Sequence, residues 1–345
     1  MDDNGIGQRK DEHIDIVINE GVTMSRTTGF ENFAFIHQAL PEIDLTEISL
    51  ATTFLGHQLS APLLISSMTG GTERGQEINR HLAEAARELG LAMAVGSQRI
   101  MLEDPQAIPS FSVVREVAPD IALFGNLGAI QFNYGMALDD LKEAADLIHA
   151  DGMFLHLNPL QESIQPEGQT NFSGLLDKIG EMAQSLAIPL LIKEVGGGIA
   201  PNLARKLAER HVQGIDVSGA GGTSWAAIEG MRTTDPARRR LAQVFANWGI
   251  GTARSLILCR RVLPTFPLIA SGGIRNGLDA AKALALGANL VGLAYPLLKP
   301  ATTGTKEVIE VLRQFLTEIQ VAMFLTGSKT VNDLKTRRVI RPVHE

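Results

Sequence analysis

Eight short apolar runs recur along this chain, and each is followed by a segment with helical character. The runs lie at residues 62–68, 91–96, 121–127, 153–157, 189–195, 215–218, 268–271 and 290–294. Nearly continuous apolar runs are typical of parallel strands buried on both faces, because helices cover both sides of such a sheet. The pattern therefore predicts an α/β chain in which strands and helices alternate.

The expected helices fall between these runs, at 76–89, 138–149, 200–210, 278–286 and 306–325. Gly90 and Gly287 directly follow two of them, as is common at helix C-termini. Asp139 and Asp140 lie in the first turn of a third, where acidic side chains complement the helix dipole. These end signals support the helix assignment.

Eight strand–helix units predict a closed (β/α)8 barrel, the TIM barrel. The alternative is an open doubly wound sheet, which would carry a dinucleotide-binding glycine fingerprint. Gly219 and Gly221 begin like such a fingerprint, but its third position is Ser224 and no acidic partner follows at the right distance. The closed barrel is therefore the favoured fold.

The repeat also divides the chain. Residues 1–61 precede the first run and are expected to form an N-terminal extension, 62–326 the barrel, and 327–345 a C-terminal tail. The spacing between the sixth and seventh runs is unusually long. Its polar part, 229–240, is expected to be an inserted mobile loop.

Composition restricts the partners and the compartment. With 31 Lys and Arg against 38 Asp and Glu the net charge is −7, and no basic stripe interleaved with aromatics is present, so we expect no nucleic-acid partner. The single cysteine, Cys259, allows no intrachain disulfide and fits a reducing cytoplasm. The polar first ten residues do not resemble a secretory signal, and no apolar stretch is long enough to span a membrane.

Polar and glycine residues follow the predicted strands, at the barrel end where enzymes of this fold place their active sites. The loops in question lie at 67–71, 96–99, 126–128, 156–162, 193–198, 218–223, 271–275 and 294–296. Because every one of these loops is polar or glycine-rich, their coincidence at one end predicts an active site more strongly than any single motif does.

Several of these candidates admit two interpretations. The turn at Gly272 and Gly273 suits a phosphate at a helix start, although it could be an ordinary left-handed turn. Lys193 lies inside an apolar strand, where a cation requires a partner. A salt bridge to Glu194 is disfavoured because neighbouring strand residues face opposite sides, so a ligand contact is favoured for Lys193.

Other candidates are weaker when taken alone. A single carboxylate such as Glu162 can hold Mg²⁺ together with substrate phosphates and waters, but a loop Glu is usually just solvated. His156 could be a satisfied core histidine or a functional one. Arg9, Lys10 and His13 near the N-terminus could be a solvated tail.

Read together, these loops resemble the type 2 isopentenyl-diphosphate isomerases, which are FMN-dependent enzymes. The resemblance is carried by Arg9-Lys10-Asp11-Glu12-His13, Met68-Thr69-Gly70-Gly71, Gly96-Ser97-Gln98-Arg99, His156-Leu157-Asn158-Pro159-Leu160-Gln161-Glu162, Lys193-Glu194-Val195-Gly196 and Gly221-Gly222-Thr223. It extends from about residue 9 to the last predicted helix, and the histidine-to-glutamate stretch is its most specific part.

The resemblance implies a role for each candidate. FMN would be bound by Ser67, Met68, Thr69, Ser97, Asn126, Lys193, Ser218 and Thr223, with its phosphate on Gly272, Gly273, Ala294 and Tyr295. The diphosphate substrate would be held by Arg9, Lys10, Ser97, Gln98, Arg99, Asn158 and Gln161, under a lid formed by the N-terminal extension. Glu162 would hold Mg²⁺, and the catalytic candidates would be Gln161, His156 and Lys193.

The chemistry agrees with this assignment. Moving a double bond requires a proton delivered to one carbon and another removed nearby, and an isolated alkene is a poor base. A reduced flavin beside the alkene could supply acid–base chemistry, while the protein supplies orientation and a dry cavity. NAD(P)H is the expected reductant, and a cytoplasmic homo-oligomer, tetramer or octamer, is the expected assembly.

Three other functions fit the sequence less well. An FMN barrel that oxidises 2-hydroxy acids needs a His base near residues 219–223, and none is present there. A purine-nucleotide dehydrogenase of the same barrel type needs a nucleophilic Cys in an active loop, and Cys259 is misplaced. A non-catalytic flavin carrier would have no use for the Gln161-Glu162 pair together with Arg9 and Lys10.

Overall fold

The computed structural model of the chain describes residues 4–336 and 338–343, so the ends of both predicted terminal segments lie outside the described residues. Eight parallel strands form a closed barrel, in the order β10-β11-β4-β5-β6-β7-β8-β9. These strands are β4 (Leu63–Ile65), β5 (Ala92–Ala94), β6 (Leu123–Gly128), β7 (Gly152–Leu157), β8 (Leu190–Glu194), β9 (Gly214–Asp216), β10 (Leu268–Ala270) and β11 (Leu290–Leu293). Each strand falls within or overlaps one predicted run, so the (β/α)8 prediction is confirmed.

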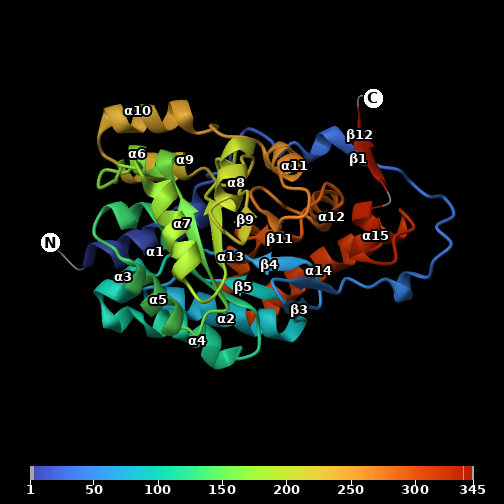
Figure 1. Cartoon of the computed structure of the whole chain (residues 1–345), viewed down its shortest axis with the longest axis horizontal. Helices are drawn as coiled ribbons and strands as arrows, with labels where there is room; N and C mark the ends of the chain where they lie inside the picture. The colour runs from blue at the N-terminus through green and yellow to red at the C-terminus, as the bar shows by residue number, and fades with distance from the viewer. Residues whose placement is uncertain (1–3, 337, 344–345) are drawn as a thin grey trace.

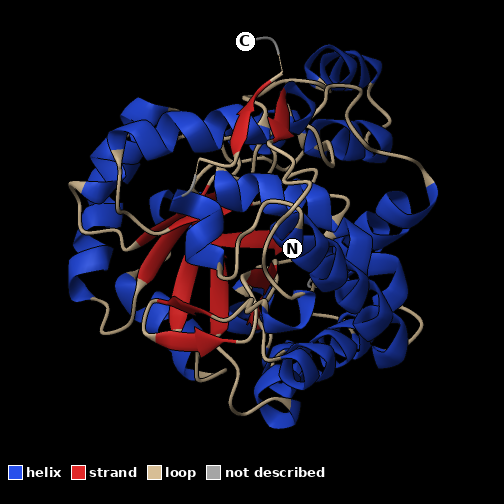
Figure 2. Cartoon of the chain, turned by 90° about the vertical axis from the view of Figure 1, so that its right-hand side faces the viewer, coloured by secondary structure: helices blue, strands red, loops and turns tan. Residues whose placement is uncertain are grey.

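Helices surround this barrel on all sides (Figures 1 and 2). The outer ring contains α2 (Glu73–Leu89), α4 (Pro109–Val117), α5 (Leu138–Asp146), α7 (Leu175–Ser185), α8 (Pro201–Ala208), α11 (Thr252–Val262), α12 (Gly277–Ala285) and α14 (Thr305–Phe324). The helix α2 illustrates how the sequence sets their ends. Thr72 caps its start by accepting from the Gly75 amide, and Gly90 ends it with a φ of 62°.

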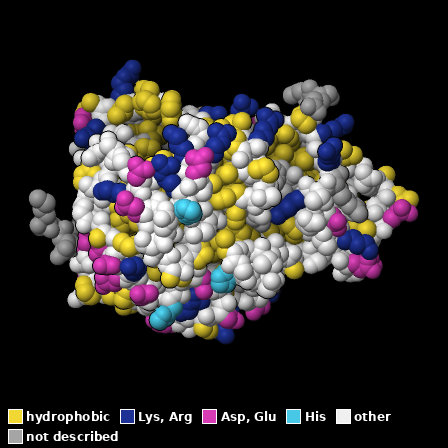
Figure 3. All heavy atoms as spheres, in the orientation of Figure 1, with side chains coloured by type: hydrophobic (Ala, Val, Ile, Leu, Met, Phe, Trp, Pro, Cys, Tyr) yellow, Lys and Arg dark blue, Asp and Glu magenta, His cyan; other side chains and the backbone are white. Residues whose placement is uncertain are grey.

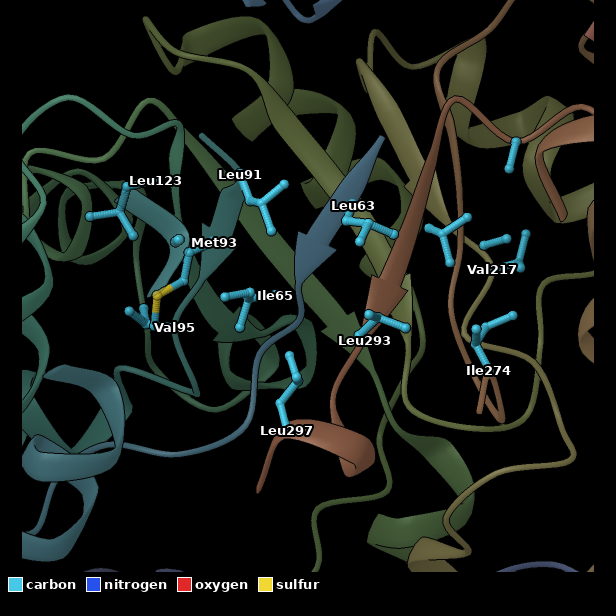
Figure 4. Packing of buried hydrophobic residues seen from close by; sticks show 14 of the residues in the cluster. Leu63, Ile65, Leu91, Met93, Val95, Leu123, Val217, Ile274, Leu293 and Leu297 are labelled. Carbon is cyan, nitrogen blue, oxygen red and sulfur yellow. The ribbon is translucent and has the colours of Figure 1, made fainter. Parts of the chain in front are cut away.

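Alternation along the strands produces two hydrophobic cores. One set of strand side chains points outward to the helices, and Figure 4 shows Leu63, Ile65, Met93 and Leu293 of this set. The other set fills the barrel interior, where Phe124 and Phe154 have ring centroids 5.6 Å apart. Burial on both faces is why the strands read as continuous apolar runs.

A short hairpin closes the bottom of the barrel. It consists of β2 (Thr52–Phe54) and β3 (His57–Leu59), and Phe54 packs against Phe124 with ring centroids 6.3 Å apart. The bottom is thus filled by aromatic side chains. A cavity inside the barrel itself is therefore restricted to the opposite end.

The two terminal segments pack against each other and against the barrel. The strand β1 (Phe33–Phe35) pairs with β12 (Ile340–Pro342), and α15 (Val331–Thr336) precedes the second strand. Val331, Leu334 and Val339 are buried. The described part of the chain after residue 326 therefore contributes side chains to the core.

Further short elements decorate the barrel. They are α3 (Arg99–Glu103), α6 (Pro159–Ile164), α13 (Tyr295–Ala301), η1 (Phe30–Asn32), η2 (Leu45–Glu47), η3 (Pro105–Ala107) and η4 (Ala129–Asn133). Among the described helices, none has both the length and the apolar character needed to cross a bilayer.

The prediction of a mobile loop at 229–240 is wrong. Two helices, α9 (Trp225–Arg232) and α10 (Pro236–Phe245), occupy this region. Ser224 caps the start of α9 and Asp235 caps the start of α10. The two helices pack closely where Ala242 meets Gly230, and a side chain added at Gly230 would collide with Ala242. Ser224 and Asp235 are helix-capping residues that the sequence contains, but the polar composition of 229–240 favoured the loop interpretation.

The N-terminal extension begins with α1 (Asn4–Asn19), which contacts α9 and α13. Figure 1 places α1, α6, α9 and α10 at the same end of the molecule, on the left. These helices cover the barrel end at which strands β4 to β11 terminate. They form the roof over the candidate site.

Candidate active site

A cavity of about 440 Å³ opens at the carboxyl ends of the barrel strands. It lies beneath α1, which contributes Arg9, Lys10 and His13 to its wall. The other predicted site residues that line it are Ser67, Met68, Thr69, Ser97, Arg99, Asn126, His156, Asn158, Gln161, Glu162, Lys193, Ser218, Thr223, Gly272, Gly273, Ala294 and Tyr295. Residues that are far apart in the chain therefore share one pocket.

Gln98 is the predicted site residue that the structure does not bring to this cavity. Its side chain is fully buried. Its Oε1 accepts from the backbone N–H of Asn126 at 2.8 Å, and its Nε2 donates to the backbone carbonyl of Ala144 at 2.7 Å. Both ends of the amide are thus engaged by backbone groups. Gln98 fixes the strand end that carries Asn126, and its predicted substrate contact stays a prediction.

Several buried polar atoms around the cavity lack a hydrogen-bond partner within the described part of the chain. Buried polar groups are nearly always paired, so a cluster of unpaired ones on a cavity wall indicates a polar ligand. These atoms are Ser66 Oγ, Ser67 Oγ, Thr69 Oγ1, Asn158 Oδ1, Gln169 Oε1 and Arg275 Nη2, and all six residues line the cavity.

The turn after β10 is built from glycines because no other residue fits. Gly272 and Gly273 have φ values of 98° and 75°, in the left-handed region that disfavours side chains. A Cβ on Gly272 would collide with the Gly219 carbonyl of the neighbouring loop. Arg275 lies close by, with its guanidinium 4.4 Å from the Tyr295 ring centroid. This backbone cradle beside a cation suits a phosphate group.

Lys193 is buried at the end of β8. Its Nζ donates to the Glu194 carbonyl at 2.8 Å, and burial lowers its pKa, although the Asp216 carboxylate opposes that effect. The Glu194 carboxylate points elsewhere and accepts from the Val195 and Gly196 amides at 2.6 and 2.7 Å. No ion pair joins these two side chains among the described residues, so Lys193 is left facing the cavity.

His156 at the end of β7 is a neutral imidazole. Burial and the nearby charges of Lys193 and Lys10 lower its pKa to about 3. Its Nδ1 lies 2.8 Å from Asn126 Oδ1. His156 therefore offers the cavity a fixed, uncharged ring and cannot act as a cation near neutral pH.

The start of α6 gathers three polar side chains. Asn158 Nδ2 donates to Glu162 Oε1 at 2.8 Å and to Gln161 Oε1 at 3.3 Å. The backbone N–H of Gln169 donates to Glu162 Oε2 at 2.7 Å. These hydrogen bonds orient both carboxylate oxygens of Glu162, and a single cation could bind to this buried carboxylate. No group of three or more His, Cys, Asp and Glu side chains suited to a metal occurs in the described residues, so other ligands would have to come from substrate and water.

Glu229 and Arg232 on α9 are functional candidates that the sequence did not reveal. Glu229 is fully buried, and its Oε1 accepts from Gln161 Nε2 at 2.9 Å. Arg232 Nη1 lies 2.6 Å from Glu229 Oε2, and His13 Nε2 lies 3.1 Å from Oε1. Burial opposes ionisation of Glu229, but these partners outweigh it and hold its pKa at about 2. The i, i+3 spacing of Glu229 and Arg232 was the one available signal.

The helix α1 is docked over the cavity and is not a solvated tail. Lys10 Nζ donates to the carbonyls of Gly70 and Ser97 at 2.7 and 2.8 Å. Burial and the neighbouring charge of Arg9 lower the pKa of Lys10 to about 7. Arg9 Nη1 forms an ion pair with Glu167 Oε1 at 3.1 Å. The basic side chains of Arg9 and Lys10 thus both lie at the roof of the cavity.

The sequence matches the family described as FMN-dependent dehydrogenase, over residues 7–107 and 150–341. The chain belongs to this family. A relative from Synechococcus sp. is 50% identical over 341 residues, which are 99% of this chain and 98% of the relative. One from Xanthobacter autotrophicus is 49% identical over 97% of this chain and 98% of its own length. Both are named isopentenyl-diphosphate delta-isomerase.

Solved structures share the fold of this FMN-dependent dehydrogenase family member at low identity. A mandelate oxidase has a TM-score of 0.66 at 18% identity, covering 95% of this chain and 94% of its own. The flavin-binding domain of baker's yeast flavocytochrome b2 has a TM-score of 0.70 at 16% identity, covering 97% and 90%. These solved structures therefore share the barrel fold of this chain.

The cavity residues fit the flavin mononucleotide that the family name implies. The glycine cradle and the unpaired Arg275 Nη2 suit its phosphate. The unpaired hydroxyls of Ser67 and Thr69 and the buried ammonium of Lys193 suit the polar edge of its ring system. FMN is the cofactor that these groups would hold.

Proposed function

We propose that this protein isomerises isopentenyl diphosphate to dimethylallyl diphosphate with reduced FMN in the barrel. The observation that carries the proposal is one cavity with two parts. We assign the flavin to the part lined by Lys193 and Gly272, and the diphosphate with its metal ion to the part lined by Arg9, Lys10 and Glu162. Relatives 45–50% identical over nearly the whole chain bear this enzyme name.

The residues around the first part would hold the cofactor. Its phosphate would rest on Gly272, Gly273 and the turn at Ala294 and Tyr295. Its ring would contact Ser67, Met68, Thr69, Ser97, Asn126, Lys193, Ser218 and Thr223. When bound in its reduced form, FMN supplies an acid–base group and electron density beside the alkene.

The diphosphate would be held at the roof. Arg9, Lys10 and Arg99 line this part of the cavity and supply positive charge. Lys10 has a pKa of about 7, and an approaching anion raises it, because an opposite charge favours the protonated amine. Mg²⁺ at Glu162 would neutralise further negative charge, as a single carboxylate with substrate phosphates usually does.

Gln161 is fixed by two hydrogen bonds and would face the reacting part of the substrate. Its Nε2 donates to Glu229, and its Oε1 accepts from Asn158. An amide neither gains nor loses a proton near neutral pH, so Gln161 orients the substrate and polarises its surroundings. Glu229, with its low pKa, stays a carboxylate and fixes this orientation.

Apolar and aromatic side chains of the roof would help to exclude water once substrate is bound. Ile14 and Val17 of α1 and Trp225 of α9 line the cavity. A dry cavity strengthens the electrostatic effect of Lys193 on developing negative charge at the cofactor, and it protects reactive species from hydrolysis. The docked position of α1 is therefore part of the catalytic design.

Oxidation of a 2-hydroxy acid is the alternative within the same family. It needs a histidine base, and no His lies near residues 219–223. His156 lines the cavity, but its low pKa and its bond to Asn126 make it a poor proton acceptor. Cys259 is buried, with a pKa of about 11, so a cysteine nucleophile is also disfavoured.

Finer parts of the proposal concern supply and assembly. NAD(P)H is the proposed reductant, because the isomerisation has no net redox change yet requires reduced flavin. We propose a cytoplasmic homo-oligomer, a tetramer or octamer. Support for association comes from exposed apolar side chains such as Val244 on α10 and Trp248 just after it, at 67% and 62% exposure, in a region where Figure 3 shows apolar atoms gathered.

The test begins with purified protein, whose visible spectrum should show flavin. Isopentenyl diphosphate should be converted to dimethylallyl diphosphate in the presence of Mg²⁺ and a reductant, and not under oxidising conditions. Conversion of a 2-hydroxy acid with no isomerisation would favour the alternative function.

The variant Glu162→Gln tests the metal assignment. It should retain FMN but lose most of its response to Mg²⁺, because the oriented carboxylate is gone. Glu181→Gln, an exposed change on α7, serves as the matched control. An unaltered Mg²⁺ titration in Glu162→Gln would contradict the assignment.

A further inference from the structure

Two ion pairs at the roof differ in kind, one within α9 and one between α1 and the segment after α6. Arg232 of α9 pairs with the fully buried Glu229 at 2.6 Å, and the Arg232 side chain itself is 13% exposed. Arg9 of α1 pairs with Glu167, which follows α6, at 3.1 Å. The Glu167 side chain is 45% exposed. The two contacts differ mainly in their access to water.

This difference predicts which contact can be exchanged. Breaking a buried pair leaves a charge without solvent, so the Arg232–Glu229 contact is permanent. An exposed pair of the Arg9–Glu167 kind changes an equilibrium by about five-fold at most, because water competes for both partners. Arg9 can therefore leave Glu167 at little cost when a stronger anion arrives.

A diphosphate is such an anion, and it would meet Arg9 at the same place. Both Arg9 and Glu167 line the cavity. A guanidinium binds carboxylate and phosphate oxygens with the same fork geometry, so the two compete for it. The carboxylate also repels a polyanion that approaches Arg9.

We infer that Glu167 is an affinity-determining residue, a carboxylate that occupies Arg9 in the free enzyme and is displaced by the diphosphate. This inference rests on the proposed function. Once displaced, Glu167 keeps a partner, because Arg232 Nη1 and Nη2 lie 3.4 and 3.5 Å from its Oε1. The exchange lowers the affinity for every diphosphate and thereby speeds release of the product.

The experiment measures the binding of inorganic pyrophosphate to the FMN-loaded protein with Mg²⁺, by isothermal titration calorimetry. Glu167→Gln should bind about two- to five-fold more tightly than wild type, which is the span expected for an exposed ion pair. KM for the diphosphate substrate should fall in parallel, without a rise in kcat. Unchanged or weaker binding overturns the inference.

Glu12→Gln is the matched control. Glu12 is 42% exposed and also pairs with Arg232, at 3.2 Å, but it has no contact with Arg9 among the described residues. Removing its charge should change the pyrophosphate affinity by less than about two-fold, as for a surface change away from the ligand. An equal gain in Glu12→Gln would mean that any nearby negative charge acts alike, and the specific exchange would be refuted.

A double-mutant cycle isolates the contact itself. Arg9→Gln should weaken pyrophosphate binding, and adding Glu167→Gln in that background should bring no further tightening. If Glu167→Gln tightened pyrophosphate binding equally in the wild-type and Arg9→Gln backgrounds, the effect would be general charge repulsion between Glu167 and the ligand. If wild type neither binds pyrophosphate nor isomerises the substrate, the proposed function fails, whereas an active wild type with an unaffected Glu167→Gln refutes the exchange alone.

Discussion

The buried ion pair between Glu229 and Arg232 gives a prediction that can be worked out in numbers. Arg232→Gln removes the cation but keeps a polar side chain of similar reach. In the native protein Glu229 is fully buried and contacts His13 and Gln161 as well as Arg232. The variant therefore leaves a buried carboxylate with neutral or weak partners.

The pKa of Glu229 provides the magnitude. Its partners hold it at about 2, against an ordinary value of 4.5, in spite of burial. That lowering corresponds to about 3 kcal/mol of stabilisation, since each pKa unit is worth about 1.4 kcal/mol. His13 and Gln161 contribute to this lowering before Arg232 does, so we expect the loss of Arg232 alone to cost about 1 kcal/mol of unfolding free energy at neutral pH.

The pH dependence has a definite sign. Because the folded pKa of Glu229 lies below its unfolded value, the stabilisation is fully present above pH 4.5 and is lost as the pH falls from 4.5 towards 2. The difference between wild type and Arg232→Gln should therefore shrink across that window. In the variant, burial should dominate and raise the pKa of Glu229 above its native value.

Urea unfolding at several pH values measures this difference. Local docking of α1 can be followed by the fluorescence of Trp225, whose ring centroid lies 5.1 Å from that of His13, in a Trp248→Phe background. Arg240→Gln, at an exposed position on α10, is the control. The reasoning is refuted if Arg232→Gln is as stable as this control at pH 7, or if its deficit does not vary with pH.

Three further predictions concern the flavin half of the cavity. Lys193→Ala should make flavin reduction less favourable, and an unchanged midpoint in a reductant titration would count against this role for Lys193. Gly272→Ala should weaken FMN binding by about ten-fold or more in fluorescence titrations, because the added Cβ meets the Gly219 carbonyl at a φ of 98°. His156, with a pKa of about 3, should show no NMR titration between about pH 5 and 8, and an inflection near its ordinary value of 6.5 would disprove its neutrality. Folding stability should fall as the pH drops from 6.5 towards 3, because over that range the unfolded state binds a proton at His156 and the folded state does not.

Much of the fold could be predicted because a parallel barrel leaves a simple pattern. Strands covered on both faces must be apolar throughout, so β4 to β11 appear as uninterrupted runs. Chain direction then forces the residue after each strand onto the same rim, which is why Lys193 and Gly272 could be placed in one pocket in advance. These inferences need only local sequence and the geometry of parallel strands.

Side-chain direction could not be predicted in the same way. Gln98 has the polarity of a binding residue, but its amide is consumed by the backbone of Asn126 and Ala144. Glu229 and Arg232 have the composition of a solvated helix face, but packing of α1 against α9 buries them. Such outcomes depend on which neighbour arrives from a distant part of the chain.

The sequence by itself determined the barrel, its order of strands and the rim that carries the chemistry, because burial pattern and chain direction are properties of short segments. The tertiary structure decided which rim residues reach the cavity, where α1 lies, and which carboxylates stay charged. Those features depend on solvent exclusion and on charges from segments far apart in the sequence. They exist only when the helices close over the barrel.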